Sequence, residues 1–236
     1  GRYAQTVVGV GWAVIQPLFF MVVFTVVFGN LAKVSSDGLP YAIFSFAALT
    51  PWTFFSGALT DGSASLVRAA SMLSKVYFPR LVIPIAPILG RLVDFGIAMV
   101  MLCGMMAWFR ISPTIWALTL PFMVLLMVLT VAGLSMWLSS LAIQYRDVRH
   151  AMTFGIQLLM YAAPVVYPAS LIPDRYRLVY GVNPMAGVIE GFRSALLGSL
   201  PMPWDLLIVG SVSATIIAVG GVFYLRRMER IFADVA

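Results

Sequence analysis

Charged side chains are scarce in this sequence. They make up 10% of its 236 residues, whereas hydrophobic residues make up 61% and the mean hydropathy is +0.98. Soluble globular domains carry about 25% charged residues, so the composition excludes a soluble enzyme or a soluble binding domain. The alternation of apolar and polar residues that is typical of a membrane β-barrel is missing as well. The sequence therefore predicts an all-α integral membrane protein.

Side chains for catalysis and metal binding are also nearly absent. Cys103 stands alone inside an apolar run, which excludes a disulfide within the chain and a cysteine-based metal site. His150 has only Asp147 near it at ligand spacing, so we expect no metal. No serine or cysteine is placed with a histidine deep in an apolar run, and paired aspartates are missing there, so we expect no catalysis.

A nucleotide site is missing from the sequence too. No phosphate loop of the form GxxxxGK(S/T) occurs, and no polar stretch is long enough to fold a nucleotide-binding domain. We therefore expect no cofactor in this chain, and the energy for any active transport must come from a partner.

Long apolar runs are what the sequence does contain. A membrane-crossing helix needs about 20 apolar residues, because each residue rises about 1.5 Å through a hydrocarbon core about 30 Å thick. Six runs qualify, so we predict a single transmembrane domain over residues 1–236. The expected spans lie near residues 11–31, 41–60, 81–108, 113–143, 151–169 and 206–225. We expect the opening residues, GRYAQTVVG, to be the end of an interfacial segment that begins upstream.

The cations are unevenly divided between the predicted loops. With a cytoplasmic N-terminus, nine lysines and arginines fall on the cytoplasmic side and five on the other side. The positive-inside rule favours that orientation, and an even number of spans then returns the C-terminus to the cytoplasm. Anionic membrane lipid explains the net charge of +6, so no nucleic-acid partner is needed.

Residues 61–80 form a polar interruption between the second and third spans. Apolar residues within 66–77 recur at three- and four-residue steps, which predicts a short amphipathic helix with Arg68 and Lys75 off its apolar stripe. Such a helix either rests on the inner leaflet as a connector or offers a docking site to a partner.

Arg91 and Asp94 fall inside the third span, about 15 Å from its cytoplasmic end. A lone charge at that depth costs several kcal/mol, but residues three apart share a helix face and neutralise each other. We predict an intramembrane ion pair that faces the bundle, and the alternative is a part in transport. A proton-driven carrier is expected to hold more acids, whereas Asp94 is the only one well inside a predicted span.

Aromatic residues form rows in the first two spans. Flat rings suit the apolar faces of sugars, and Trp and Tyr add a polar edge. The alternative is packing against neighbouring helices or lipid, as in interfacial belts. Both readings stay open for the residues of these rows, which on the first reading would line a sugar path: Trp12, Phe20, Phe24, Phe28, Tyr41, Phe44, Trp52 and Phe55.

Two segments near the C-terminal end carry packing signals. Residues 170–205 are too polar to cross a membrane and are interrupted by prolines, so we expect either short interfacial or re-entrant helices in the outer leaflet or an ordinary loop. Gly210, Ala214 and Ala218 lie four residues apart, which predicts close helix packing within the bundle or across a dimer axis.

Four stretches together resemble one protein family, and they occur in that family's order. They are GRYAQTVVGVGWAVIQP (1–17), KVYFPR (75–80), QYRDVR (144–149) and NPMAGVIEGFR (183–193). They are similar to the permease subunits of ABC-type-2 exporters, and most similar to the branch that exports O-antigen, capsule or teichoic-acid chains. The likeness covers almost the whole chain.

The resemblance implies a half-transporter of the bacterial inner membrane. Two copies would form the path of a lipid-linked polysaccharide, and two ATPase subunits beneath them would hold ATP and Mg²⁺. It also implies that residues 62–80 couple to the ATPase, that the loop 144–150 makes a smaller contact, and that residues 170–205 close the outer end. The residues that it implies in ATPase contact are Arg68, Leu73, Lys75, Tyr77, Phe78, Arg80, Arg146 and Arg149.

Two other functions remain open at the level of sequence. The same architecture could export a drug or a lipid, because such cargo also presents apolar surface. A self-contained carrier or channel is the other alternative, for which an inverted internal repeat is expected. No convincing repeat is visible in the sequence.

Overall fold

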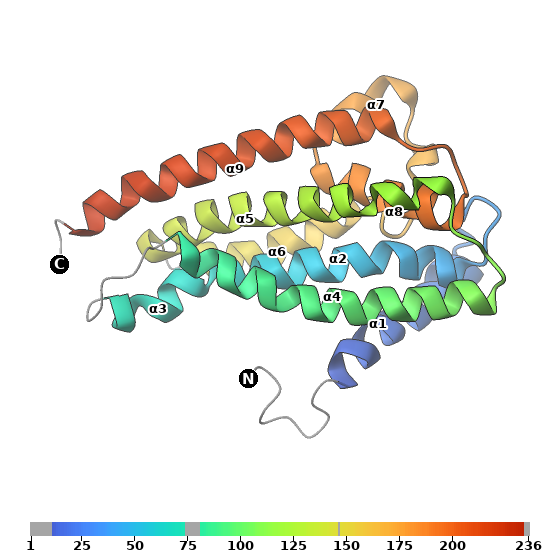
Figure 1. Cartoon of the computed structure of the whole chain (residues 1–236), viewed down its shortest axis with the longest axis horizontal. Helices are drawn as coiled ribbons and strands as arrows, with labels where there is room; N and C mark the ends of the chain where they lie inside the picture. The colour runs from blue at the N-terminus through green and yellow to red at the C-terminus, as the bar shows by residue number, and fades with distance from the viewer. Residues whose placement is uncertain (1–10, 74–80, 146, 234–236) are drawn as a thin grey trace.

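The protein is a bundle of helices that lie side by side along its longest axis (Figure 1). The computed structural model describes residues 11–73, 81–145 and 147–233, and this part of the chain contains no strand. In chain order the helices are α1 (Gly11–Phe24), the π-helix η1 (Thr25–Leu31), α2 (Tyr41–Ser63), α3 (Ser65–Leu73), α4 (Val82–Trp108), the 3₁₀-helix η2 (Ile115–Thr119), α5 (Leu120–Gln144), α6 (Asp147–Tyr161), the 3₁₀-helix η3 (Ala169–Leu171), α7 (Asp174–Gly181), α8 (Pro184–Leu197) and α9 (Trp204–Ala233). The predicted all-α fold is confirmed.

Five helical stretches among the described residues are long and apolar enough to cross a membrane. They are Val14–Leu31, Tyr41–Ala69, Val82–Trp108, Ile115–Gln144 and Trp204–Met228. The expected span 151–169 differs, because α6 ends at Tyr161 after 15 residues and turns follow it. Pro164 and Pro168 explain the end of the helix, since proline has no N–H to donate and disfavours helical backbone in the residue before it.

Helix α2 is the centre of the bundle. Of its membrane-span window, 78% is buried inside the chain, against 11–28% for the other four windows. It contacts α1, α4, α5 and α8, and Figure 1 shows it running between α4 and α5. Its buried Thr50 hydroxyl donates to the Phe46 carbonyl at 2.9 Å, so this polar group needs no partner outside its own helix.

Helices α5 and α9 approach closely because glycine faces small residues. A Cβ atom on Gly133 of α5 would lie 2.6 Å from the Cα atom of Ala218 on α9, and one on Gly221 would lie 2.6 Å from the Gly133 carbonyl oxygen. The stripe of small residues predicted for the last span thus packs within the chain: Ala218 faces α5, and Gly210 faces Pro184 of α8.

The short helices lie at opposite ends of the bundle. Figure 1 shows α3 at one end, and α7 and α8 at the other. The loop before α2 also belongs to the α7–α8 end, since the Ser170 hydroxyl donates to the Asp37 carboxylate at 3.1 Å. The amphipathic segment after α2 is therefore separated by the length of the bundle from the segment 170–205.

The contact between α5 and α9 gives the first testable prediction. Gly133→Ala should lower the free energy of unfolding by about 1–3 kcal/mol, because a methyl group there meets main-chain atoms of α9. Thermal unfolding in detergent micelles checks this. Gly104→Ala on α4 is the matched control, since its Cβ meets nothing within 4 Å, and it should leave stability unchanged or slightly raised. Equal stability of the two variants would contradict the prediction.

Candidate functional site

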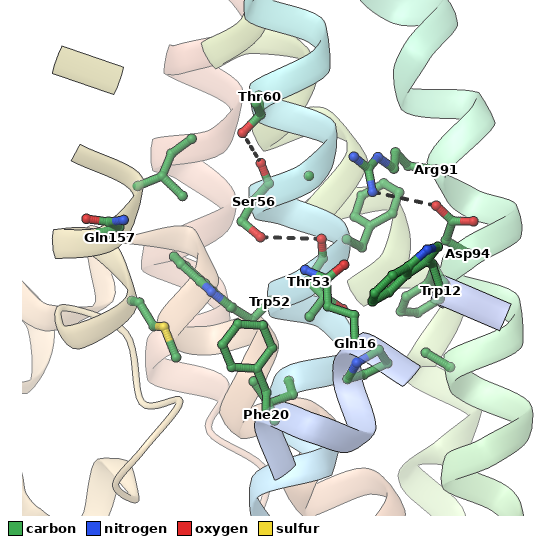
Figure 2. Close-up of a pocket in the computed structure, with 18 residues that line it drawn as sticks. Trp12, Gln16, Phe20, Trp52, Thr53, Ser56, Thr60, Arg91, Asp94 and Gln157 are labelled. Carbon is green, nitrogen blue, oxygen red and sulfur yellow. Dashed lines mark hydrogen bonds and ion pairs between the residues drawn. The ribbon is translucent and has the colours of Figure 1, made fainter. Parts of the chain in front are cut away.

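A pocket of about 470 Å³ lies between α1, α2, α4 and α6. Its volume is within the range of roughly 300–1,000 Å³ that is typical of ligand-binding pockets. Figure 2 shows its lining, which combines aromatic rings with hydroxyl, amide and charged groups. The lining residues are Trp12, Gln16, Pro17, Phe20, Leu49, Trp52, Thr53, Phe54, Ser56, Gly57, Thr60, Arg91, Asp94, Phe95, Ala98, Ile156, Gln157 and Met160.

Helix α1 supplies a wall of rings and an amide. Trp12, Gln16 and Phe20 recur at four-residue steps, so they share one face of the helix. All three line the pocket (Figure 2). Trp12 is 51% exposed and Phe20 is 39% exposed, so both rings are accessible to a ligand.

Helix α2 supplies a row of hydroxyl groups along the same pocket. The hydroxyls of Thr53, Ser56 and Thr60 donate to carbonyls three or four residues earlier in the helix, at 3.2, 3.4 and 2.7 Å. Each hydroxyl proton is thereby used within α2, and the oxygen lone pairs are left as acceptors. This wall is therefore suited to a ligand that donates hydrogen bonds.

Arg91 of α4 joins two acids at the edge of the pocket. Its Nε donates to Oδ2 of Asp61 on α2 at 2.8 Å, and its Nη1 lies 3.6 Å from Oδ2 of Asp94. The three side chains are only 17–22% exposed, so their charges are partly shielded from solvent. Arg91 and Asp94 thus lie within ion-pair distance, but the shorter contact is with Asp61, which the sequence assigns to the start of the polar interruption.

The pocket connects to α8 through aromatic rings. Phe54 of α2 and Phe95 of α4 line the pocket and meet edge to face, with ring centroids 5.7 Å apart. Phe95 in turn meets the buried Phe192 of α8 at 6.1 Å. A change in the position of α8 therefore bears on the pocket through a direct ring contact.

The neighbouring residue, Arg193, is fully buried and holds irregular backbone. Its guanidinium donates to the carbonyls of Phe44, Pro164, Val165 and Tyr167 at 2.5–3.3 Å. It also lies 3.4 Å from the Glu190 carboxylate and 3.6 Å from the centre of the Phe44 ring. Burial lowers the pKa of the Arg193 guanidinium, and the Glu190 charge opposes that change.

The sequence around Arg193 explains why α8 forms where it does. Asn183 caps the helix, because its Oδ1 accepts from the Met185 N–H at 3.1 Å, and Pro184 follows at the first helical position. Gly198 ends it in the left-handed conformation with φ +64°. The Asn183 amide also donates to the Ala162 carbonyl at 3.3 Å, which ties α8 to the end of α6.

The aromatic residues of the predicted path lie in different surroundings in the structure. Trp12, Phe20 and Trp52 line the pocket, whereas Phe24 and Phe28 continue the α1 row edge to face, with centroids 5.5 Å apart. The other three rings of the prediction, like Trp52 and Phe24, are buried within the single chain, but they do not line the pocket: Tyr41, Phe44 and Phe55.

Tyr41 and Phe44 have structural contacts that explain their burial. The Tyr41 hydroxyl donates to the Val166 carbonyl at 2.6 Å, and the Phe44 ring lies under the Arg193 guanidinium. Within one subunit both rings therefore support the turn after α6. The aromatic path itself stays a prediction.

The residues predicted to contact an ATPase are only partly described. Arg68 lies on α3 with 60% of its side chain exposed, and Leu73 is the last residue of that helix. Arg149 lies in the first turn of α6. Lys75, Tyr77, Phe78, Arg80 and Arg146 lie outside the described residues.

The sequence predicts Asp94 as a partner of Arg91, but it does not indicate Asp61 as a second partner, nor Glu190 as the partner of Arg193. The predicted second span ends near residue 60, which places Asp61 in the polar interruption, whereas α2 continues to Ser63 and brings Asp61 to Arg91. Glu190 and Arg193 have the same three-residue spacing that predicted the Arg91–Asp94 pair. That spacing was the available signal for the second pair.

Comparisons with known proteins agree with this architecture. The family model described as "ABC-2 type transporter" matches residues 1–197. An O-antigen export system permease protein RfbA from Klebsiella pneumoniae is 23% identical over 235 residues, which cover 99% of this chain and 90% of that protein. A protein of the same name from Myxococcus xanthus is 25% identical over 232 residues, which cover 97% of this chain and 88% of the relative.

The buried guanidinium gives the second testable prediction. Arg193→Lys should lower the free energy of unfolding by about 3 kcal/mol, because an ammonium group cannot reach the four carbonyls that the planar guanidinium holds, and unsatisfied buried groups cost about 1–3 kcal/mol each. Denaturant titration in micelles measures this. Arg175→Lys, an exposed position on α7, is the control and should match the wild type. A loss no larger than that of the control would contradict the assigned role.

Proposed function

The chain belongs to the ABC-2 type transporter family, and from this membership we propose that it is the transmembrane subunit of an ATP-driven exporter for a lipid-linked polysaccharide. The cargo class comes from the relatives named as O-antigen export permeases, which align with nearly the whole chain. O-antigen, capsule and teichoic-acid chains all fall within this proposed cargo class. The family resemblance carried by the four sequence stretches is thereby confirmed.

The pocket supports a sugar cargo on chemical grounds, and this is the observation that carries the proposal beyond the family. Trp12, Phe20 and Trp52 offer flat rings, and Thr53, Ser56 and Thr60 offer hydrogen-bond acceptors on the adjoining wall. Sugar rings have apolar C–H faces and donating hydroxyls, so they match both features. An alkyl chain would leave the row of acceptors without partners.

We propose that energy enters through α3. This helix follows the central α2 with a single residue, Ala64, between them. It lies at the end of the bundle opposite α7 and α8 (Figure 1), as expected of a cytoplasmic contact if residues 170–205 face outward. A separate ATPase subunit would bind ATP and Mg²⁺ and press on this helix, so the chain itself would act without catalysis.

We further propose that two copies assemble in the bacterial inner membrane with both termini in the cytoplasm. The support lies in Gln16 of α1 and Gln157 of α6, which line the pocket and are exposed in the single chain. Polar groups at membrane depth face a protein interior or a water-filled path and avoid lipid. A second copy against α1 and α6 would enclose them, together with the Arg91–Asp94 pair.

The third prediction tests the proposed coupling. The wild type, reconstituted in vesicles with its ATPase, should hydrolyse ATP and export lipid-linked polysaccharide. Lys75→Glu/Arg80→Glu should keep at least half of the ATP hydrolysis and lower export about tenfold, because reversed charges at the proposed contact with the ATPase would weaken it by about 1.4 kcal/mol or more.

Lys33→Glu/Arg175→Glu is the matched control, since it changes the same charge at the α7–α8 end and both side chains are exposed. It should export like the wild type. Full export by Lys75→Glu/Arg80→Glu would disprove the coupling, and uphill transport by vesicles that contain this chain alone would disprove the need for an ATPase.

A further inference from the structure

Four charged side chains form a continuous line from α3 to the pocket. Arg68 of α3 donates from Nη2 to the main-chain oxygen of Asp61 at 2.6 Å and lies 3.9 Å from its carboxylate. The same carboxylate accepts from Arg91 Nε at 2.8 Å, and Arg91 Nη1 lies 3.6 Å from Asp94. Two positive and two negative charges cancel along this line.

Gly57 provides the space in which the Arg91 guanidinium lies. It is one turn before Asp61 on α2, and a Cβ atom on it would lie 2.8 Å from both Cζ and Nη1 of Arg91. The planar group therefore lies directly on the backbone of α2, where a side chain would displace it. Because Gly57, Arg91 and Asp94 all line the pocket, the contact between α2 and α4 is also part of the pocket wall.

The acid that Arg91 holds lies in the last turns of α2, next to α3. Helix α3 begins at Ser65, and the Arg68 N–H donates to the Ala64 carbonyl at 3.1 Å, so α3 is joined to α2 almost without a loop. The Arg68 side chain is 60% exposed, which makes its link to Asp61 weak. The Asp61–Arg91 contact is shielded and short, so it is the firmer connection between these turns and the pocket.

On the basis of the proposed function, we propose that Arg91 is a positioning residue that transmits a displacement of α3 to the pocket. When the ATPase moves α3, the last turn of α2 carries Asp61 with it, and Arg91 pulls on the α4 wall of the pocket through its own backbone and through Asp94. The guanidinium suits this role because its N–H groups point in fixed, separate directions toward the two acids. A lysine would keep the charge and lose that geometry.

The test uses the reconstituted exporter with its ATPase and two kinds of variant. Gly57→Ala keeps every charge but displaces the guanidinium, and Arg91→Lys keeps the charge but loses the two-sided contact. Gly90→Ala is the matched control, since nothing lies within 4 Å of its Cβ position. The readouts are polysaccharide exported per ATP hydrolysed, and hydrogen exchange of α3 and α4 with and without ATP.

We expect export per ATP to fall about tenfold in Gly57→Ala and Arg91→Lys, within the range by which coupling networks are modulated by mutation, and to stay at the wild-type value in Gly90→Ala. The ATP-dependent change in exchange should persist in α3 and disappear from α4. Both variants should bind the ATPase and unfold near the wild-type temperature.

The proposal is overturned if both variants export normally, if Gly90→Ala fails equally, or if the response of α3 is lost together with that of α4. A wild type that exports while α4 shows no ATP-dependent change overturns the role of Arg91 and leaves the proposed function standing. A wild type that binds no ATPase and exports nothing overturns the proposed function itself.

Discussion

The bundle depends on pairing the polar backbone groups that α6 leaves open where it ends early. In a membrane, irregular backbone is tolerated only where protein groups or water satisfy it. Here the Arg193 guanidinium donates hydrogen bonds to the carbonyls of Pro164, Val165 and Tyr167. The Tyr41 hydroxyl donates to the carbonyl of Val166. The turn after α6, the start of α2 and helix α8 are therefore joined by one buried cation.

Helix α2 contacts a different arginine near each of its two ends. At the α7–α8 end, Phe44 supplies both a carbonyl and a ring to Arg193. At the α3 end, Asp61 supplies a carboxylate to Arg91. The pocket lies along the length of helix between these two contacts, where Thr53 and Ser56 turn their hydroxyls to their own backbone. The two arginines therefore hold α2 near its ends, and hydroxyl oxygens that can accept hydrogen bonds lie along the helix between them.

Hydrophobic run length predicted most of the fold, because a helix that crosses lipid must satisfy its backbone internally whatever its neighbours are. It did not predict the early end of α6, where Pro164 breaks the helix and a distant Arg193 makes the break tolerable. The pairing of Arg91 with Asp94 followed from spacing on one helix, whereas its contact with Asp61 joins residues 30 apart and depends on how α2 and α4 pack. The burial of Phe44 could not be predicted from the sequence either. The spacing of aromatic residues along a helix is the same whether the rings face a cavity or a buried guanidinium.

The helices that line the pocket and those behind it are packed differently. Between α5 and α9, Gly133 and Gly221 bring backbone against backbone, so sliding there would force main-chain atoms together. The first span is the opposite case: only 11% of its window is buried, and it contains the π-helix η1, a form that often marks functional sites within helices. Within the single chain α1 is therefore loosely packed, whereas α2 is held near both of its ends and α5 packs closely against α9. The two pocket walls that make the fewest contacts with the rest of the described chain are those of α6 and α1, and these are the walls that a second copy would cover in the proposed assembly.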